Sequence, residues 1–139
     1  MSDIFSSEKR SEIMSKISGK DTKPEILVRK FLFAHRFRFR KNDKKLPGKP
    51  DIVLPKYKII IFVHGCFWHG HKGCKKSKLP ETRKDFWEEK INATINRDYK
   101  NIQDLETLGW RIIVVWECEL GKNQEQTLSD LINLISRNT

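Results

Sequence analysis

The clearest structural signal in this sequence is the segment Lys58-Ile59-Ile60-Ile61-Phe62-Val63, which is wholly apolar after its first residue. An apolar run of this length predicts a strand that other elements cover on both faces, so it belongs at the centre of a sheet. Residues 59–63 are far too few to span a bilayer, and we expect no membrane segment. We therefore take residues 58–63 as the central strand of a single domain.

A helix is predicted upstream of this strand. Thr22 fits its N-cap, Pro24 is tolerated in its first turn, and Glu25 occupies the third position of a capping box. The apolar residues 26, 27, 31 and 34 recur at helical spacing, so they predict the buried face. We expect this helix to end at about Arg36.

The remaining segments complete an α/β pattern. Strands are expected at residues 37–40, 51–54 and 111–116, and helices at residues 81–108 and 128–135. Turns separate the strands, and residues 64–79 form an irregular loop. Strands joined by a hairpin and then by a helical crossover give a mixed sheet flanked by helices. The prediction is one α/β domain over residues 21–139.

The charge of the chain points to a polyanionic partner. It has 28 Lys and Arg against 18 Asp and Glu, a net charge of +10, which attracts polyanions at long range. The basic residues are concentrated in residues 9–30 and 36–49, which favours nucleic acid over general solubility as the explanation. Residues 1–20 are polar and basic, with one short helical patch, and predict an arm outside the core.

The loop after the central strand has the composition of a metal site. Residues 64–74 contain two cysteines and three histidines, and Cys118 is the remaining cysteine. The three cysteines and one histidine would form a closed tetrahedral zinc site. Three unrelated thiols are the alternative, because residues 1–7 lack an apolar signal segment and the expected cytoplasmic location disfavours disulfides. The spacing leaves three candidates for the fourth ligand: His64, His69 and His71.

A second pattern resembles the restriction-endonuclease-like nucleases. Pro50-Asp51 begins a short strand, and the next strand ends in Phe62-Val63-His64. In those nucleases an Asp at a strand end binds Mg²⁺, which activates water and neutralises the charge on the phosphate. This chain departs from their motif, because Phe62 stands where the second acid belongs and His64 replaces the lysine.

That departure is itself similar to the very-short-patch repair (Vsr-type) endonucleases. The block Ile61-Phe62-Val63-His64-Gly65-Cys66-Phe67-Trp68-His69 carries the resemblance, with Leu46-Pro47-Gly48-Lys49-Pro50-Asp51 upstream. It covers about residues 8–120, through Thr82-Arg83, Phe86-Trp87, Glu89-Lys90, Asn96-Arg97-Asp98, Leu108-Gly109-Trp110-Arg111 and Val115-Trp116-Glu117-Cys118. The resemblance implies a restriction-endonuclease-like fold. It also implies an enzyme that nicks one DNA strand beside a T:G mismatch, the product of deaminating 5-methylcytosine, and so starts repair.

The resemblance assigns catalytic roles. It makes Asp51 the Mg²⁺ ligand, together with the main-chain carbonyl of Val63. It makes His69 the general base that activates water, Glu25 the carboxylate that orients it, and His64 a second catalytic histidine near the scissile phosphate. Each residue has a plainer alternative: a helix cap for Glu25, a turn acid for Asp51, a strand-end histidine for His64 and a spare metal ligand for His69.

The resemblance also selects the zinc ligands and the DNA-contacting residues. The zinc ligands implied are Cys66, His71, Cys74 and Cys118, with one residue more between His71 and Cys74 than the family pattern has. Phe67, Trp68 and Trp87 match an aromatic wedge that enters the duplex, where unstacking costs least at a mismatch. Core packing is the alternative for Trp87, and it is our interpretation of Trp110 and Trp116. Met14, in the arm, matches a residue that enters the minor groove.

Two further function classes compete with this hypothesis. One is a degenerate nuclease or a non-catalytic, zinc-stabilised DNA-binding module that recognises distorted duplex, suggested by the missing second acid. The other is a redox or hydrolytic enzyme with a reactive cysteine. We expect a monomer, because a nick needs one active site, in a bacterial-type cytoplasm near the nucleoid. The resemblance also raises the hypothesis of a functional link to a cytosine-5 methyltransferase and to mismatch-repair proteins.

Overall fold

A mixed sheet forms the centre of the protein in a computed structural model that describes residues 22–137. Within those residues the sheet has four strands, in the spatial order β1-β2-β3-β4. They are β1 (Arg40–Lys41), β2 (Ile52–Leu54), β3 (Ile59–His64) and β4 (Arg111–Trp116). Strands β1 and β2 pair antiparallel, as do β2 and β3, whereas β3 and β4 are parallel. The central position predicted for residues 58–63 and the mixed sheet are confirmed.

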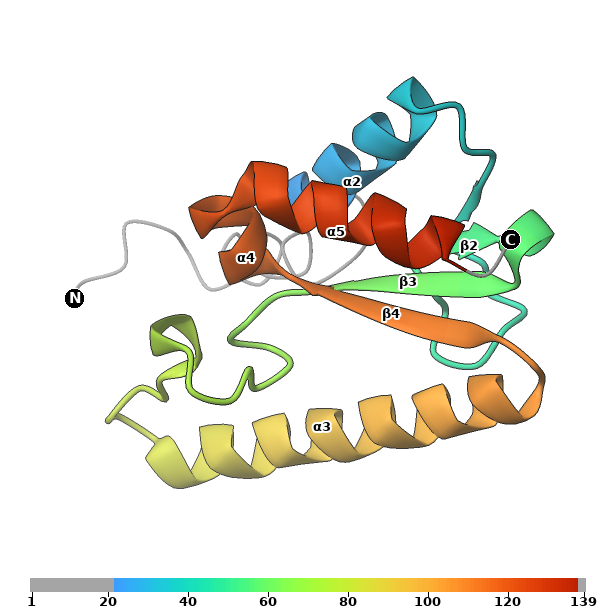
Figure 1. Cartoon of the computed structure of the whole chain (residues 1–139). Coiled ribbons are helices and arrows are strands. Elements are labelled where there is room, and N and C mark those ends of the chain that lie inside the picture. The colour runs from blue at the N-terminus through green and yellow to red at the C-terminus, as the bar shows by residue number, and fades with distance from the viewer. Residues whose placement is uncertain (1–21, 138–139) are drawn as a thin grey trace, which may run out of the picture.

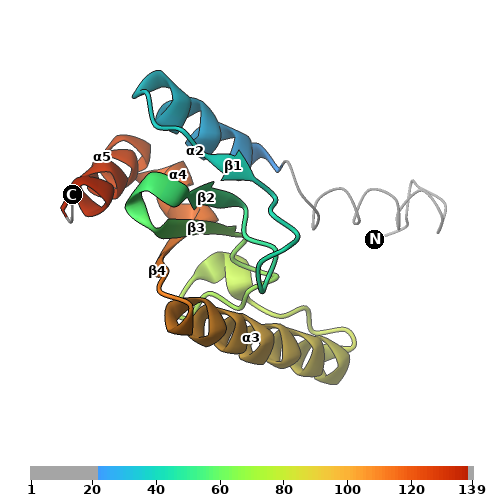
Figure 2. The same cartoon turned by 90° about the vertical axis from the view of Figure 1, so that its right-hand side faces the viewer.

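Helices cover both faces of this sheet, as Figures 1 and 2 show. On one face lie α2 (Lys23–Ala34) and α5 (Gln124–Ser136), with the short α4 (Glu117–Lys122) between β4 and α5. On the other face lies the long α3 (Lys84–Thr107), which forms the crossover from β3 to β4. Two single 3₁₀ turns, η1 (Pro55–Tyr57) and η2 (Lys75–Ser77), lie in the connections. The result is a single three-layer α/β domain.

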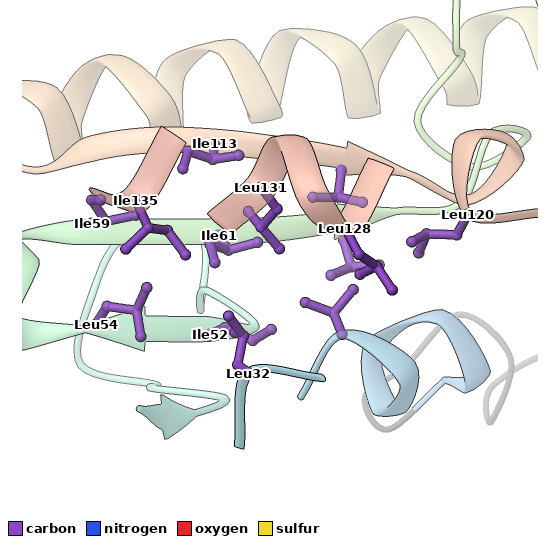
Figure 3. Close-up of a cluster of buried hydrophobic side chains, with 13 residues drawn as sticks. Leu32, Ile52, Leu54, Ile59, Ile61, Ile113, Leu120, Leu128, Leu131 and Ile135 are labelled. Atoms are coloured by element: carbon purple, nitrogen blue, oxygen red, sulfur yellow. The ribbon is translucent and has the colours of Figure 1, made fainter. Parts of the chain in front are cut away.

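The apolar run of β3 is explained by this layering. Successive side chains of a strand point to opposite faces, so a strand covered on both sides needs apolar residues throughout. Ile59, Ile61 and Val63 belong to the cluster under α2 and α5, which Figure 3 shows in close-up, whereas Ile60 and Phe62 belong to the cluster under α3. Burying a side chain of this size contributes about 1.5–3 kcal/mol relative to leaving it exposed.

The first helix differs from its prediction in two respects. It ends at Ala34 rather than near Arg36, whose left-handed conformation (φ 65°) breaks the helix. Its fully buried residues are Glu25, Val28 and Leu32, whereas the apolar residues expected on the buried face are half-buried and Ala34 is exposed. The predicted face was therefore wrong by about one position, and it missed the burial of a carboxylate.

Other element boundaries also shift. The strand expected at residues 37–40 pairs only at Arg40–Lys41, although Phe37 and Phe39 pack against the core. The long helix begins at Lys84 instead of residue 81, because Arg83 before it is left-handed (φ 57°). The last helix begins a turn earlier than predicted, and α4 was not predicted.

No helix in the part of the chain that the structure describes is both long and apolar enough to cross a membrane. The predicted basic arm, residues 1–20, and Met14 within it lie outside the described residues.

Candidate functional site

The predicted catalytic residues gather around one cavity of about 930 Å³. The walls come from the start of α2, the loop before β2, the end of β3 with the loop that follows it, and the middle of α3. Four of the side chains that line it were singled out from the sequence as catalytic: Glu25, Asp51, His64 and His69. Residues separated by more than forty positions therefore meet in one place.

Asp51 is held by the neighbouring strand. Its Oδ2 accepts a hydrogen bond of 2.7 Å from the main-chain N–H of Val63. The N–H and C=O of one strand residue point to the same side, so the carbonyl of Val63 is also directed toward the Asp51 side of β3. A carboxylate oxygen and a carbonyl oxygen thus lie at one edge of the cavity, which is the donor set that Mg²⁺ prefers.

Glu25 places a second carboxyl group beside Asp51. Burial, followed by the negative charge of Glu25, raises the pKa of Asp51 from 3.8 to about 7. The side chain of Glu25 is only 3% exposed, and Arg29 one turn further along α2 contacts it at 3.3 Å. Thr22 caps the helix by accepting from the N–H of Glu25, as predicted. A buried carboxyl group whose proton affinity is raised by burial and by a neighbouring carboxylate is an arrangement that a divalent cation relieves.

The ring of His69 is oriented by Asp98. The distance between His69 Nδ1 and Asp98 Oδ2 is 2.6 Å, and a carboxylate accepts only, so Nδ1 carries the proton that is donated. This leaves the lone pair on Nε2, where it can accept a proton from water. Glu25 was expected to orient this base, but the carboxylate bonded to the ring is that of Asp98, on α3, whereas Glu25 lies beside Asp51.

His64 is buried beneath His69. Their rings are parallel, with centroids 3.8 Å apart and an interplanar angle of 2°, and the edge of Trp116 meets His64 at 5.2 Å. Burial, followed by the charge of His69, lowers the pKa of His64 to about 4, so the ring is neutral at physiological pH. Among the described residues, none makes a hydrogen bond to the buried Nδ1 of His64. This histidine therefore keeps unused hydrogen-bonding capacity at the cavity.

Three cysteines and a histidine converge beside the cavity. The ligand atoms of Cys66, His71, Cys74 and Cys118 all lie within 4.8 Å of one another. Cys118 Sγ is 3.4 Å from His71 Nδ1, close to the roughly 3.6 Å that a tetrahedral zinc ion sets between a sulfur and a nitrogen ligand. The group predicted from the sequence is thus brought together, and its donor chemistry fits a tetrahedral metal.

The loop that carries these ligands is tied down by its own backbone. The N–H of His71 donates to the carbonyl of Cys66 at 2.9 Å. The hydroxyl of Ser77 donates to the carbonyls of His71 and Cys74, at 2.6 and 2.7 Å. Burial raises the pKa of the Cys66 thiol to about 12, so this sulfur is not a nucleophile at neutral pH unless a cation lies beside it. The convergence of four ligand atoms gives this loop the character of a metal site.

The register of the sheet connects the metal group to the histidines. His64 and Trp116 are partners at the ends of the parallel strands β3 and β4, and a metal-group cysteine follows each of them by two residues. The ring of His71 stacks on Trp116 with centroids 4.0 Å apart at 8°. Trp116 is thus half-buried between the metal group and His64. The interpretation of Trp116 as an ordinary core residue was wrong. Trp110 is half-buried against the cluster under α3.

Aromatic side chains form one margin of the cavity. Phe67, Trp68 and Trp87 contact one another edge to face, with centroids between 5.2 and 5.9 Å apart, and all three are half-buried. Phe86 extends this cluster and is 41% exposed. Phe67 and Trp68 also line the cavity. The three predicted wedge residues therefore lie together, next to the carboxyl groups and histidines.

Two residues of the site were not identified individually from the sequence. Asp98 was noted only as part of a segment that resembles the Vsr-type endonucleases. A carboxylate on a long helix usually faces solvent. Trp116 ended an apolar strand, which is typical of core residues. Only the register of β3 and β4, or the packing of α3 under the strand ends, brings them to the site. No spacing rule within the sequence carries that information.

Comparison with known proteins agrees with this geometry. The family model described as DNA mismatch endonuclease Vsr matches residues 2–76. The chain is 59% identical to the type II nicking enzyme V.NmeAIP of Neisseria meningitidis, over 86% of this chain and 85% of that protein. It is 42% identical to the DNA mismatch endonuclease Vsr of Escherichia coli, over 91% of this chain and 81% of that protein. The chain belongs to the Vsr family of DNA mismatch endonucleases.

Proposed function

We propose that this protein nicks one strand of duplex DNA beside the T of a T:G mismatch, by Mg²⁺-dependent hydrolysis, and so initiates very short patch repair. The observation that carries this proposal is that the Asp51–Glu25 pair and the Asp98–His69 pair face one cavity. One pair suits a cation and the other suits proton transfer. Hydrolysis of a phosphodiester needs both.

Asp51 and the main-chain carbonyl of Val63 are the residues that would hold Mg²⁺. The ion supplies positive charge at the scissile phosphate and polarises the attacking water. Oδ2 of Asp51 is already fixed by the Val63 N–H, which leaves the other carboxylate oxygen for the ion. Glu25 adds negative charge to the same edge from α2 and so increases the affinity for a dication.

His69 is the base in this proposal. Asp98 fixes the tautomer with the proton on Nδ1, so Nε2 can take the proton of the attacking water, and the resulting imidazolium is stabilised by the Asp98 carboxylate. His64, the second catalytic histidine of this proposal, stays neutral because of its burial and so does not compete for that proton. The stacking of the two rings holds both in place at the wall of the cavity.

The tetrahedral cysteine–histidine group would hold a structural Zn²⁺. Four protein ligands leave no open coordination position, as structural zinc sites require. The ion would join the ends of β3 and β4, because Cys66 and Cys118 follow those strands directly. Its role is to hold the loop between β3 and α3, whose regular structure is limited to the 3₁₀ turn η2.

The aromatic cluster supports the choice of a mismatch as the target. Flat rings beside the cavity can enter a base step, and unstacking costs least where pairing is already weak. Arg83 lies 4.3 Å from the ring centre of Phe86, and Lys90 lies 5.9 Å from that of Trp87. Positive charges therefore lie beside the aromatic rings, where they can contact the DNA backbone. Met14, outside the described residues, would contact the minor groove.

The relatives' names point the same way. The E. coli protein is called a DNA mismatch endonuclease and the Neisseria protein a nicking enzyme, and both activities are combined in the proposal. We further propose a monomer in the cytoplasm, associated with the nucleoid. A functional link to a cytosine-5 methyltransferase and to mismatch-repair proteins is part of the same hypothesis.

A nicking assay tests this function. Purified protein with Mg²⁺ is incubated with end-labelled duplexes that carry T:G or C:G at one position in several sequence contexts. We expect a single nick in the T strand of the T:G duplex only. The variant Asp51→Ala should bind that duplex without cutting it. Equal cutting of T:G and C:G duplexes would leave a nuclease without mismatch recognition.

A degenerate DNA-binding module remains the alternative, and the structure bears on the observation that suggested it. Phe62, which stands in place of the second acid, packs into the cluster under α3 and so belongs to the core. Glu25 brings a carboxyl group to Asp51 from a different element. The assay separates the two hypotheses, because binding without cutting in every context would favour the module.

A further inference from the structure

A positively charged side chain at the scissile phosphate is the part of the nuclease motif that the strand ends do not provide. His64 stands in place of the motif lysine, and its side chain is 5% exposed between His69 and Trp116. Little of this ring reaches the open part of the cavity, where a phosphate must lie. A positively charged side chain that complements the metal ion would therefore come from another wall.

Lys49 lies on that wall. It lines the cavity, its side chain is exposed, and it stands two residues before Asp51. The intervening Pro50 is fully buried, so the chain between the two residues is anchored. Two residues of extended chain span at most about 7 Å, which is within the reach of a lysine side chain.

The loop that carries Lys49 is held by hydrogen bonds across its base and by a close approach to α3. It connects β1 to β2 and is closed by hydrogen bonds from the N–H of Asn42 to the carbonyl of Asp51 (3.0 Å) and from the N–H of Asp43 to that of Pro50 (3.2 Å). Gly48 lies against α3 so closely that a Cβ there would meet the Cβ of Asn101 at 3.0 Å. The backbone of Lys49 therefore has a fixed position relative to the cavity.

The conformation of Lys49 is a costly one for this residue type. Its φ of 46° is left-handed, a region that glycine adopts without strain and a side chain with Cβ does not. Its N–H donates to the carbonyl of Leu46 at 3.1 Å, which closes a turn that glycine would close equally well. The local fold therefore does not require a lysine here.

Two other lysines line the cavity. Lys44 is seven residues from Asp51 in sequence, on the far side of the same loop, and Lys23 is the first residue of α2. Neither is anchored to Asp51 by a short, buried connection. Among the described residues, Lys49 has no ion-pair partner.

We propose that Lys49 donates a hydrogen bond from its ammonium group to a non-bridging oxygen of the scissile phosphate and stabilises the charge that develops there during hydrolysis. This inference rests on the proposed nicking function. It makes Lys49 a catalytic residue that replaces the lysine missing from the end of β3. A preorganised cation acts mainly on the transition state, so its loss lowers the rate more than the affinity.

The test uses the zinc-loaded full chain and the duplex that the wild-type protein nicks fastest. Single-turnover rates at saturating protein are measured for Lys49→Gln, Lys49→Arg and Lys49→Gly, with Lys56→Gln as the control at the opposite end of the sheet. DNA affinity is measured in the Asp51→Ala background, with and without Lys49→Gln. Melting temperatures are measured for every variant.

We expect Lys49→Gln and Lys49→Gly to reduce the rate about 100-fold, and affinity to change less than threefold. Lys49→Arg should retain most of the rate, and Lys49→Gly should melt no lower than wild type because it relieves the left-handed strain. An unchanged rate, or a lost affinity with an unchanged rate, would overturn the role of Lys49 alone. A wild-type protein that nicks no duplex would overturn the proposed function and this inference with it.

Discussion

At the scale of single residues, the site contains buried ionisable groups that lower the stability of the folded protein at neutral pH. Asp51 is the clearest case, because burial and the charge of Glu25 raise its pKa to about 7. In the unfolded chain the value is near 3.8, so the folded protein binds more protons between these pH values. Stability from this residue is therefore present at low pH and is lost as pH rises toward 7.

Asp51→Asn tests this cost directly. The amide oxygen can still accept from the Val63 N–H but carries no charge, so the variant should be more stable than wild type at pH 8 without Mg²⁺, by on the order of 3 kcal/mol. At pH 4 the two proteins should be equally stable. Saturating Mg²⁺ at pH 8 should stabilise only the wild type. Thermal unfolding at both pH values, with and without Mg²⁺, checks this, and a stability difference independent of pH would contradict it.

Asp98 gives a second prediction at this scale. In Asp98→Asn, an amide N–H₂ facing Nδ1 favours the tautomer with its proton on Nε2, which then cannot accept a proton from water. Single-turnover nicking should fall by about 10²–10⁴-fold, while DNA affinity changes little. A variant that nicks at the wild-type rate would remove His69 from the role of base.

The sequence predicted which residues lie together where they belong to a dense motif, and their catalytic roles stay predictions. Asp51, His64 and His69 were identified from short segments around β2 and β3, and they do meet. Asp98 is 29 residues after His69 on a helix, where an acidic residue looks like any solvated one. Lys49 looked like one of many lysines in a basic segment until its backbone angle and its place on the cavity wall were known.

At the scale of elements, the parallel pair β3–β4 organises the site. Both strands end at the same edge, so His64 and Trp116 are neighbours and Cys66 and Cys118 follow together. A tetrahedral ion there would hold the two strand ends in place, and Trp116 would transmit that position to His64 through its two ring contacts. The metal group and His64 are therefore joined through Trp116 into one connected unit.

Cys118→Ser tests that unit. Loss of one thiolate should release the metal and lower the free energy of unfolding by more than about 2 kcal/mol, since metal binding is coupled to folding. Nicking should be lost with it. Bound zinc, melting temperature and single-turnover rate are measured together, with Glu119→Gln, exposed on the same helix α4, as the control. Retained zinc with lost nicking would instead place Cys118 outside the metal group.

The elements also show what a single sequence leaves open. The strand at residues 59–64 was evident because both of its faces are buried, which makes it wholly apolar. The segment at residues 37–40 alternates as a strand does, yet only Arg40–Lys41 finds a pairing partner on β2. Pairing is decided by the neighbouring strand and not by alternation within the segment. The helix α4 has one buried residue, Leu120, too few for a helical period to be visible.

At the scale of the whole molecule, every layer contributes to the cavity. The α2 layer provides Glu25, the sheet provides His64 and, just before β2, Asp51, and α3 provides Asp98 and, at the margin, Trp87. The site therefore exists only in the complete fold. Helices cover both faces of the sheet, as Figure 2 shows, and this explains how acidic residues from both sides of the sheet reach its edge. The order of elements along the sequence predicted a mixed sheet flanked by helices, but not which layer holds which residue.

For the complete molecule with its DNA, we predict that the aromatic margin of the cavity discriminates T:G from C:G duplexes. Trp87→Ala removes one ring of a cluster in which each ring supports the others, so the wedge loses both area and rigidity. A base-stacking ring is worth about 1–3 kcal/mol. Discrimination between T:G and C:G duplexes should therefore fall by about 5- to 150-fold. Affinity for C:G duplex should change little, because phosphate contacts by the basic surface dominate it.

Tyr99→Ala is the matched control for this variant. Tyr99 lies on the same helix and is 65% exposed, but it takes no part in the aromatic cluster or the cavity wall. Affinities for both duplexes are measured by competition at several salt concentrations, in the Asp51→Ala background. Equal losses on T:G and C:G duplexes would mean that Trp87 packs the protein and does not read the mismatch. A loss confined to T:G duplex would assign recognition to the aromatic margin, because the charge that holds matched DNA is the same in both proteins.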